Sequence, residues 1–354
     1  MNTVIKSSLA LTFLALTACG GDQPAEPPAP AMPAAQTAAP APQAPACNRG
    51  CLIEMANIYV AALAANDPSI PPLADDIAFV ENVTRMQPGE GLWESTVEGP
   101  STFAIFVPDV ELQQVGFLGV MKRRIAVENG GDNGAEEQPI VFAIRLKRGD
   151  NGQITEAEHL VSAIRPDFLA NLQSPRPGLL AQVPEESRLS YDALATMGMA
   201  YYDALDDNDG SLMPFADDCE RHENGMITAG PQAGPGPVIP GDASQAPVAR
   251  TCAAQLDSLT FTYIDRIENR RLVAVDPVTG LVMGLSHFRH PMDNLPYDVI
   301  HTDGSTSQRT NENMPFQPFD LPAAHIFKFG ADGLVHEIEA MGFTAPLDSP
   351  TGWE

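Results

Sequence analysis

Residues 59–82 read YVAALAANDPSIPPLADDIAFVEN, and residues 201–224 read YYDALDDNDGSLMPFADDCERHEN. The two stretches align without a gap at a distance of 142 positions, and 12 of their 24 residues are identical. Such a match does not arise by chance in a chain of 354 residues, so we interpret it as a tandem duplication. The sequence therefore predicts two units of the same fold.

Each unit has the same order of predicted elements. Apolar residues recur at three and four positions from Leu52 to Leu63, which predicts an amphipathic helix, and the helix over 191–205 repeats this pattern. An Asn-Asp pair then breaks the helix, and runs of alternating apolar residues follow, which indicate antiparallel strands. Helices followed by a meander of strands predict the α+β class.

Composition changes along the chain give the predicted domain boundaries. The Ala/Pro-rich segment cannot bury a core and indicates an extended tether. The predicted parts are a signal peptide (1–18), a tether (19–46), a first domain (47–165), a linker (166–188), a second domain (189–345) and a C-terminal strap (346–354).

The N-terminus has the pattern of a targeting segment. Lys6 precedes an apolar run over 9–16 that is too short to cross a membrane in the mature protein. The following Leu-Thr-Ala-Cys resembles a bacterial lipobox, which implies cleavage before Cys19 and lipidation of that residue. An ordinary signal peptide cut after Ala18 is the alternative. We expect a lipid-anchored protein of the bacterial cell envelope, at the outer membrane facing the periplasm.

Charge and cysteine content agree with an extracytoplasmic location. The formal charge of −26 disfavours nucleic acid and anionic lipid as partners, so the predicted membrane contact is through the lipid anchor only. Four Cys remain besides Cys19, an even number that suits an oxidising compartment. Of the three ways to pair them, we favour Cys47–Cys51 and Cys219–Cys252.

The repeated pattern of helix, Asn-Asp break, Ala-Asp-Asp, strand and Glu-Asn resembles the nuclear transport factor 2-like (SnoaL-like) superfamily. Overall, the chain is most similar to an uncharacterised bacterial and fungal family with two such units and a Pro-x-Gly-Trp ending, here at 350–353. The resemblance implies two cone-shaped domains, in each of which helices and a curved sheet enclose an apolar pocket. It also implies that the two cones pair through their sheets, as an intramolecular pseudo-dimer.

Ketosteroid isomerases of that superfamily carry a Tyr in a similar Y-x-A-A-L context, where it belongs to an oxyanion hole. The resemblance places this Tyr at Tyr59 and Tyr201. It places the catalytic base at Asn82 and Asn224, and Asn does not accept a proton at neutral pH. The second oxyanion position falls on Phe142 in the first unit and on His325 in the second. Ketosteroid isomerisation is therefore not expected.

The second unit has the better candidates for chemistry. Tyr201 and His325 could together polarise a carbonyl group, or they could be core residues. Strand alternation places His222 and Asn224 on one face and Glu223 on the other, so His222 is a candidate base if that face lines the cavity. A surface position for His222 is the alternative.

Other polar motifs have simpler interpretations. The pairs at 75–76 and 217–218 are candidate acid/base or Ca²⁺ carboxylates, but we expect them to shape the turn from helix to strand. His287 and His290 have the spacing H-x-x-H, which in a strand places them on opposite faces, so no metal site is predicted. His290 alone could line the second pocket.

The predicted function follows from these candidates. Trp93, on a loop with Glu90, could stack on a ligand in the first cone or plug it. We expect binding of a small, mostly apolar molecule, with Tyr59, Asn82, Trp93 and His290 as further contact residues. If the protein is an enzyme, the second unit would act as an isomerase, dehydratase or lyase without a cofactor. The alternative is a non-catalytic binding or scaffold lipoprotein.

Overall fold

The computed structural model describes residues 44–126, 135–233 and 251–354. The predicted signal peptide, Cys19 and nearly all of the predicted tether lie outside the described residues, as does most of the Gly/Pro-rich segment before Thr251. Within the described ranges, no helix is both long and apolar enough to span a membrane. The architecture is α+β, with two large sheets and few helices, and it consists of two tandem cone-like domains.

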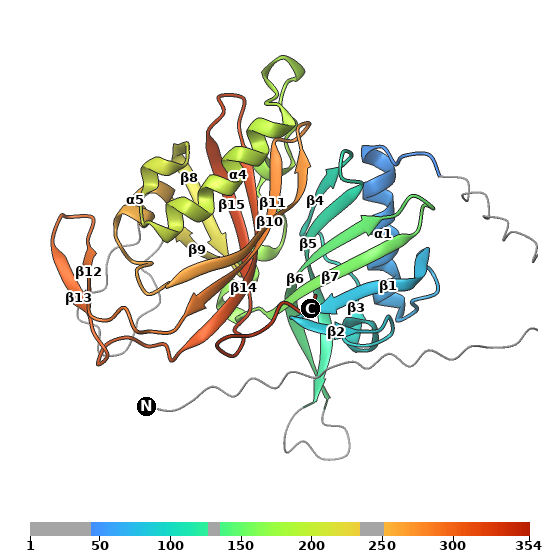
Figure 1. Cartoon of the computed structure of the whole chain (residues 1–354), viewed down its shortest axis with the longest axis horizontal. Coiled ribbons are helices and arrows are strands. Elements are labelled where there is room, and N and C mark those ends of the chain that lie inside the picture. Colours follow the sequence, from blue (N-terminus) through green and yellow to red (C-terminus); the bar gives the residue numbers. More distant parts are fainter. Residues whose placement is uncertain (1–43, 127–134, 234–250) are drawn as a thin grey trace, which may run out of the picture. The chain divides into compact units, whose positions relative to one another are not determined.

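The first cone contains two helices and seven strands (Figure 1). In chain order these are α1 (Arg49–Ala65), β1 (Leu73–Glu81), β2 (Thr84–Met86), α2 (Leu92–Ser95), β3 (Thr96–Glu98), β4 (Ala104–Asp109), β5 (Gln114–Ala126), β6 (Ala135–Arg148) and β7 (Ile154–Ala163).

The ends of α1 follow from its capping residues. The side chain of Asn48 accepts a hydrogen bond from the backbone N–H of Cys51, which caps the N-terminus. Asn66 ends the helix in the left-handed conformation, with φ of 54°, and its N–H bonds back to the last turn. Between these caps an apolar stripe that includes Leu52, Tyr59 and Leu63 is buried. The predicted break at Asn-Asp is therefore a helix C-cap.

The second cone repeats this order after a linker of short helices. The linker contains η1 (Pro166–Leu172), α3 (Pro177–Leu180) and η2 (Glu185–Ser187). The cone contains α4 (Tyr191–Asp206), η3 (Gly210–Leu212), β8 (Phe215–Glu223), β9 (Met226–Ala229), α5 (Cys252–Asp257), β10 (Arg266–Asp276), β11 (Leu281–His290), β12 (Tyr297–Ile300), β13 (Thr306–Arg309), β14 (Phe319–Phe329) and β15 (Val335–Gly342).

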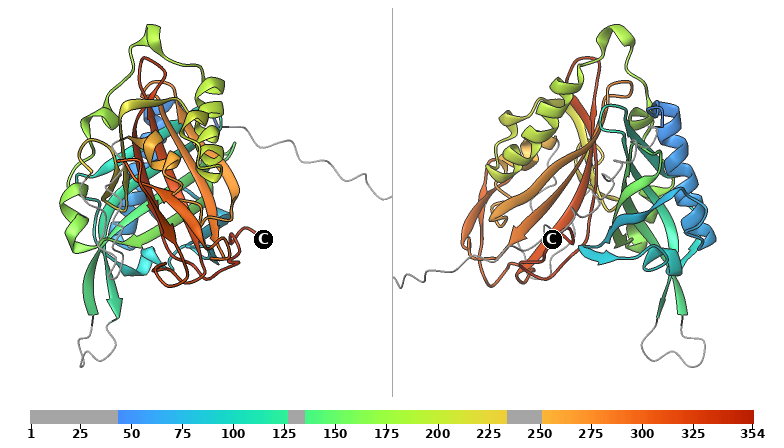
Figure 2. Two further views of the ribbon diagram at one scale, coloured as in Figure 1. Left: turned by 90° about the vertical axis from the view of Figure 1, so that its left-hand side faces the viewer. Right: turned by 45° about the vertical axis from the view of Figure 1, so that its right-hand side comes forward.

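In both large sheets the first long strand of the cone pairs with the last one. Strand order is β2-β1-β7-β6-β5-β3 in the first sheet, with β4 also paired to β5, and β10-β11-β14-β15-β8-β9 in the second. Most pairs are antiparallel, but the first long strand of each cone is parallel to its last: β1 to β7 and β8 to β15. Each long helix covers one face of its own sheet, α1 the first and α4 the second (Figures 1 and 2).

Three apolar clusters hold the fold together. One fills the first cone around Tyr59 and Phe117, and another fills the second around Tyr201 and Phe327. The third contains residues of both sheets, with Leu118 and Val141 from the first and Met283 and Ile326 from the second. The described residues of both cones accordingly belong to one compact unit. Both faces of each sheet are therefore largely buried.

Ion pairs link the two cones around the shared cluster. Arg271 on β10 binds both carboxylate oxygens of Glu158 on β7, at 2.7 and 3.0 Å. Arg49 on α1 binds Asp276, the last residue of β10. Because Glu158 and Asp276 are nearly fully buried, these contacts fix the polar groups at the edge of the interface.

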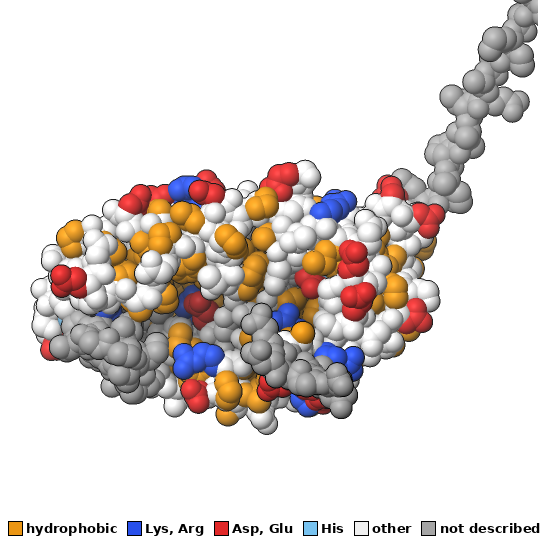
Figure 3. All heavy atoms as spheres, turned by 90° about the horizontal axis from the view of Figure 1, so that it is seen from below, with side chains coloured by type: hydrophobic (Ala, Val, Ile, Leu, Met, Phe, Trp, Pro, Cys, Tyr) orange, Lys and Arg blue, Asp and Glu red, His pale blue; other side chains and the backbone are white. Residues whose placement is uncertain are grey.

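The predicted C-terminal strap reaches from the second cone to the first. Ser349 donates its backbone N–H to Asp320, and its carbonyl accepts from Arg289. Near the end of the chain, the Trp353 ring lies 5.2 Å from the guanidinium carbon of Arg145 on β6. Over the described part of the face in Figure 3, acidic, basic and hydrophobic side chains are interspersed.

Two sequence expectations on this architecture have clear outcomes. Cys47–Cys51 and Cys219–Cys252 are disulfides in the structure, the pairing that the sequence favoured. The two Asp pairs do not precede the first strands, however. They lie inside β1 and β8 with exposed side chains, so their expected role in the helix-to-strand turn is wrong.

Candidate functional site

The second cone encloses a cavity between one face of its sheet, the end of α4 and the segment 261–264 that follows α5. The enclosed part has a volume of about 30 Å³, and the whole hollow, including space open to solvent, about 360 Å³. The enclosed part is room for about two water molecules. Its wall is mostly apolar, with four polar side chains among the lining residues Leu205, Arg221, Glu223, Phe261, Tyr263, Ile264, Phe288, His290, Leu321, Ala323, His325, Ala340 and Met341.

Arg221 on β8 organises the polar side of the cavity. It donates from Nε to the Tyr201 hydroxyl at 3.0 Å, from Nη1 to Thr228 at 2.8 Å and from Nη2 to Glu223 at 2.6 Å. Arg221 is 5 % exposed, whereas the Glu223 side chain is 27 % exposed. The guanidinium charge is therefore balanced by a carboxylate at the mouth of the cavity. Since Tyr201 accepts from Arg221, its own proton is free for another acceptor.

His325 on β14 faces the same cavity and is neutral. Burial, and then the nearby charge of Arg221, hold the pKa of His325 well below its usual range. The ring packs against Tyr201 at 5.2 Å and against Phe288 at 5.6 Å between centroids. Its Nδ1 atom is buried without a hydrogen-bond partner. A buried polar atom of this kind costs about 1–3 kcal/mol, which a bound group could recover.

His290 and Tyr263 form an aromatic wall toward the mouth. The His290 ring stacks on Phe319 at 4.2 Å and on Tyr263 at 5.2 Å. Burial lowers the pKa of His290 to about 4, so this imidazole is also neutral. Burial raises the pKa of Tyr201 as well, which keeps its hydroxyl protonated. Arg221 and Glu223 are thus the charged pair of a cavity with no net charge.

Comparison of the two cones explains why this cavity exists. The strand registers pair His325 with Ala340 in the second cone and Ile144 with His159 in the first. By the same registers Ala323 of the second cone corresponds to Phe142 of the first. The second cone therefore has Ala at two positions where the first has Phe142 and His159. These two smaller side chains, Ala323 and Ala340, leave the space that forms the cavity.

The first cone is filled instead of hollowed. Trp93 on α2 is 1 % exposed and packs edge-on against Tyr59, with ring centroids 5.2 Å apart. Behind it, the Tyr59 hydroxyl lies 2.9 Å from His159 Nε2, and His159 Nδ1 lies 3.0 Å from Glu81. Glu81 also accepts from the backbone N–H of Leu92, so it holds the plug in place. Of the two roles considered for Trp93, the structure shows the plug.

Both cones contain the same kind of polar chain, built from different strands. A Tyr of the long helix is joined through a basic side chain to the Glu of the Glu-Asn pair. In the first cone the basic side chain is His159 on the last strand, and in the second it is Arg221 on the first strand. Their counterparts are Ala340 and Phe79, so the basic group has changed strands between the repeats.

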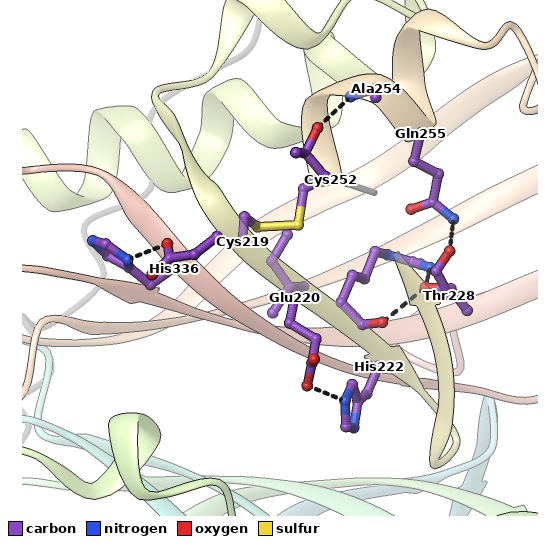
Figure 4. Close-up of a disulfide and its surroundings, with 12 residues drawn as sticks. Cys219, Glu220, His222, Thr228, Cys252, Ala254, Gln255 and His336 are labelled. Atoms are coloured by element: carbon purple, nitrogen blue, oxygen red, sulfur yellow. Dashed lines mark hydrogen bonds and ion pairs between the residues drawn. A yellow bond between two sulfur atoms is a disulfide. The ribbon is translucent and has the colours of Figure 1, made fainter. Parts of the chain in front are cut away.

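His222 does not line the cavity, which corrects its assignment as a candidate base. Its ring bonds to Glu220 at 2.8 Å (Figure 4). It lies 3.9 Å from Glu339, and strand alternation puts it on the face of β8 opposite to Arg221. Burial and the charge of Arg176 lower the pKa of His222 to about 4. Alternation along the strand is as expected, but the cavity lies on the other face.

Asn82 and Asn224 are structural residues, and their assignment to ligand contact and catalysis is corrected. Each has positive φ, and each side-chain amide bonds to both backbone groups of a residue on the last strand. The partners are Val161 and Gly342. Each Asn thus continues the parallel ladder beyond the end of β1 or β8. The expected equivalence of Phe142 and His325 is also wrong, because the strand registers align His325 with Ile144, two residues after Phe142.

The remaining candidates fall into place. His287 lies on the face of β11 opposite to His290, near Asp320 and Arg289, as the spacing predicted. Within the described ranges, no group of three or more His, Cys, Asp or Glu residues is arranged to hold a metal ion. Glu90 accepts from the backbone N–H of Gln87 and only shapes its own turn.

Sequence reasoning missed Arg221 and Glu223. Glu223 has a signal, because it is identical to Glu81 in the repeat and each of the two contacts the basic group beside the helix Tyr. Arg221 has none, because its counterpart is Phe79.

Comparisons with known proteins place the chain only coarsely. A family model described as a domain of unknown function (DUF8021) matches residues 187–342. No curated protein matches the sequence. A putative polyketide cyclase structure from Xanthomonas campestris pv. campestris is 17% identical, with 36% of this chain and 98% of that chain covered and a TM-score of 0.27.

Two further solved structures are similarly distant. A putative polyketide cyclase from Silicibacter sp. TM1040 is 16% identical, with 44% of this chain and 92% of that chain covered and a TM-score of 0.27. A conserved protein from Planctomyces limnophilus is 15% identical, with 32% and 94% covered and a TM-score of 0.24. With TM-scores this low, the likenesses carry no functional argument.

Proposed function

We propose that the second cone binds a small, mostly apolar molecule in the cavity beside Arg221. The observation that carries this proposal is the neutral imidazole of His325, which lines the cavity and has a buried ring nitrogen without a partner. Buried polar atoms in folded proteins almost always have a partner. A ligand with one hydrogen-bonding group supplies it.

The charges of the cavity select the ligand further. The Arg221–Glu223 pair cancels, and His325 and His290 are neutral, so the cavity offers no uncompensated charge to an ion. The formal charge of −26 on the whole chain also disfavours anions. A neutral molecule places an apolar body among Phe261, Tyr263 and Phe288 and one polar group at the inner end.

The same residues support proton transfer without a cofactor. Glu223 stands at the mouth as a carboxylate base, in the role first assigned to His222. It would take a proton from a carbon next to a carbonyl and return it to another carbon of the same ligand. Tyr201 would stabilise the negative charge that develops on the carbonyl oxygen, and His325 would join it in the tautomer with the proton on Nδ1. That step is an isomerisation. In a dehydratase or lyase the same carbanion would instead expel a neighbouring group, which leaves with the proton held by Glu223.

Native mass spectrometry tests the binding proposal. Wild type and the Tyr201→Phe, His325→Ala double variant are incubated with small-molecule extracts, and His287→Ala is the control because His287 lies on the opposite face of β11. We expect a bound molecule in wild type and control that is lost in the double variant. Equal retention by all three proteins would contradict the proposal.

A scaffold role is the second candidate, and one observation favours it. The apolar cluster shared by the two sheets buries the face through which such cones would otherwise pair with another chain. We propose that the chain is its own pseudo-dimer. Sedimentation equilibrium should then give a monomer, and loss of ligand binding with full retention of fold would leave the scaffold role as the function.

We also propose that the chain is lipid-anchored in the bacterial envelope. The support is the lipobox-like Leu-Thr-Ala-Cys at 16–19 and the Ala/Pro-rich segment that follows it. Metabolic labelling with an alkyne fatty acid should mark wild type but not Cys19→Ser. Labelling of the variant, or its unchanged recovery in the membrane fraction, would refute the anchor.

A further inference from the structure

The interior of the first cone contains the indole ring of the Trp93 side chain. Trp93 packs against Tyr59 in a buried cluster with Leu63, Ile140 and Phe142. The carbonyl of Trp93 accepts from Asn66, which fixes the plug to the C-cap of α1. The plug is therefore an ordered part of the cone.

The cavity of the second cone is built from the counterparts of that cluster. Leu205 corresponds to Leu63 through the repeat. Leu321, Ala323 and His325 correspond through the strand registers to Ile140, Phe142 and Ile144. All four line the cavity. The chain has only two Trp, and the other is Trp353 on the strap, so the second cone has no indole of its own.

The polar atoms at the corresponding places differ between the two cones. In the first cone the buried indole N–H of Trp93 has the Tyr59 hydroxyl as its hydrogen-bond partner. In the second cone, at the position of the apolar Ile144, His325 has a buried Nδ1 without a partner. With its proton on Nε2, the neutral imidazole accepts a hydrogen bond at Nδ1. The first cone thus supplies an acceptor to its own indole, and the second holds an acceptor that lacks a donor.

From this correspondence we infer that the second cone takes a neutral, indole-sized bicyclic aromatic molecule with an N–H donor. Trp93 is the built-in counterpart of that ligand in the first cone. The ring would lie in the part of the 360 Å³ hollow that is open to solvent, beside Phe261 and Tyr263, with its N–H toward His325. This inference rests on the proposed binding function and narrows it to one class of ligand.

Isothermal titration with indole and 1-methylindole tests the donor. The two probes have nearly the same shape, but 1-methylindole lacks the N–H. We expect wild type to bind one indole per chain and to bind 1-methylindole about 2- to 13-fold more weakly, the effect of one hydrogen bond. His325→Ile introduces the residue of the first cone and should remove this difference.

Variants that fill the cavity test the proposed binding position, and the first cone shows which residues to introduce. Ala323→Phe and Ala340→His introduce the residues found at these positions in the first cone, so each should fold and each should abolish indole binding. Trp93→Gly is the converse variant. It opens a second indole-binding cavity in the first cone. The number of indole molecules bound per chain should therefore rise from one to two, and indole should raise the Tm of this variant.

The outcomes separate this inference from the proposed function. Cyclohexanone is a neutral apolar probe without a ring of this size or an N–H. If wild type binds cyclohexanone but not indole, the ligand class is wrong and the binding function stands. If neither probe binds, both are wrong. Indole binding that survives both filling variants, or no second site in Trp93→Gly, overturns the correspondence between the cones.

Discussion

Exchanging the basic group of one cone for that of the other gives the sharpest test of the site. Arg221→Phe introduces the residue that Phe79 provides in the first cone. It leaves the Tyr201 hydroxyl without its donor and Glu223 without its partner. Leaving the buried Tyr201 hydroxyl without its donor costs about 2 kcal/mol of unfolding free energy. Leaving the partly exposed Glu223 carboxylate without its ion-pair partner costs about 1 kcal/mol more. The single variant should lose about 3 kcal/mol of unfolding free energy.

Ala340→His restores the chain in the form used by the first cone. Alone, it crowds Arg221 and should cost about 1 kcal/mol. In the double variant, the new imidazole accepts from Tyr201 and donates to Glu223, as His159 does between Tyr59 and Glu81. The double variant should therefore be only about 1 kcal/mol less stable than wild type, a coupling of about 3 kcal/mol.

Urea unfolding followed by circular dichroism measures this cycle, with an unchanged m-value as the check on two-state behaviour. Arg270→Phe is the control, because Arg270 pairs with Asp203 and Asp206 near the surface and should cost less than about 1 kcal/mol. A double variant that loses the sum of the single losses, about 4 kcal/mol, would refute the equivalence of the two polar chains.

Three further predictions concern stability. Burial raises the pKa of Glu339 to about 7. Because the folded state then binds a proton that the unfolded state has released, the contribution of Glu339 to stability is fully present below about pH 4.5 and is lost as pH rises through 7, by up to about 3 kcal/mol. Glu339→Gln should remove this slope in unfolding measured between pH 4.5 and 8, and an unchanged slope would contradict the assignment. The Cys219–Cys252 disulfide spans 33 residues and should contribute about 4 kcal/mol, whereas Cys47–Cys51 spans 4 and should contribute about 2 kcal/mol; equal losses of Tm in the two double-Ser variants would count against the loop-entropy argument. Arg271→Met should separate the unfolding of the two cones, seen as two calorimetric transitions, because it removes the ion pair of Glu158 across the interface and leaves Glu158 with Arg145 of its own cone. A single transition at lower temperature would show that the apolar cluster and the Arg49–Asp276 pair are enough to couple the cones.

The repeat made the fold predictable from the sequence. Identical residues such as Tyr59/Tyr201 and Asn66/Asn208 have similar structural positions in both cones, because each Tyr is buried on the long helix and each Asn has positive φ at or just after the end of that helix. The orientation of β8 was not predictable. Alternation gives two faces, but both are buried near the end of β8, one beside α4 and α5 and the other beside Arg176 of the linker. Burial therefore does not distinguish His222 from Arg221.

The register of the last hairpin was available in the sequence. Lys147, Glu156 and Glu158 match Lys328, Glu337 and Glu339 at a distance of 181 positions, which pairs Ile144 with His325. The assignment of Phe142 to His325 followed an oxyanion position taken from a distant family. The internal repeat was the better guide, because the hydrogen-bond ladder of each hairpin fixes its register.

The parallel pairing of the first and last strands of each cone has a consequence for how the chain is made. Val80 pairs with Glu158, and His222 pairs with Glu339, so β1 and β8 cannot complete their hydrogen-bond ladders until these later residues have been synthesised. At a synthesis rate of about 5–20 residues per second, the waits are roughly 4–16 s and 6–23 s. During that time each first strand has an unpaired edge and an uncovered apolar face, which is the form in which strands aggregate. The nascent chain is therefore most vulnerable in its two opening strands, and a holding chaperone would act there.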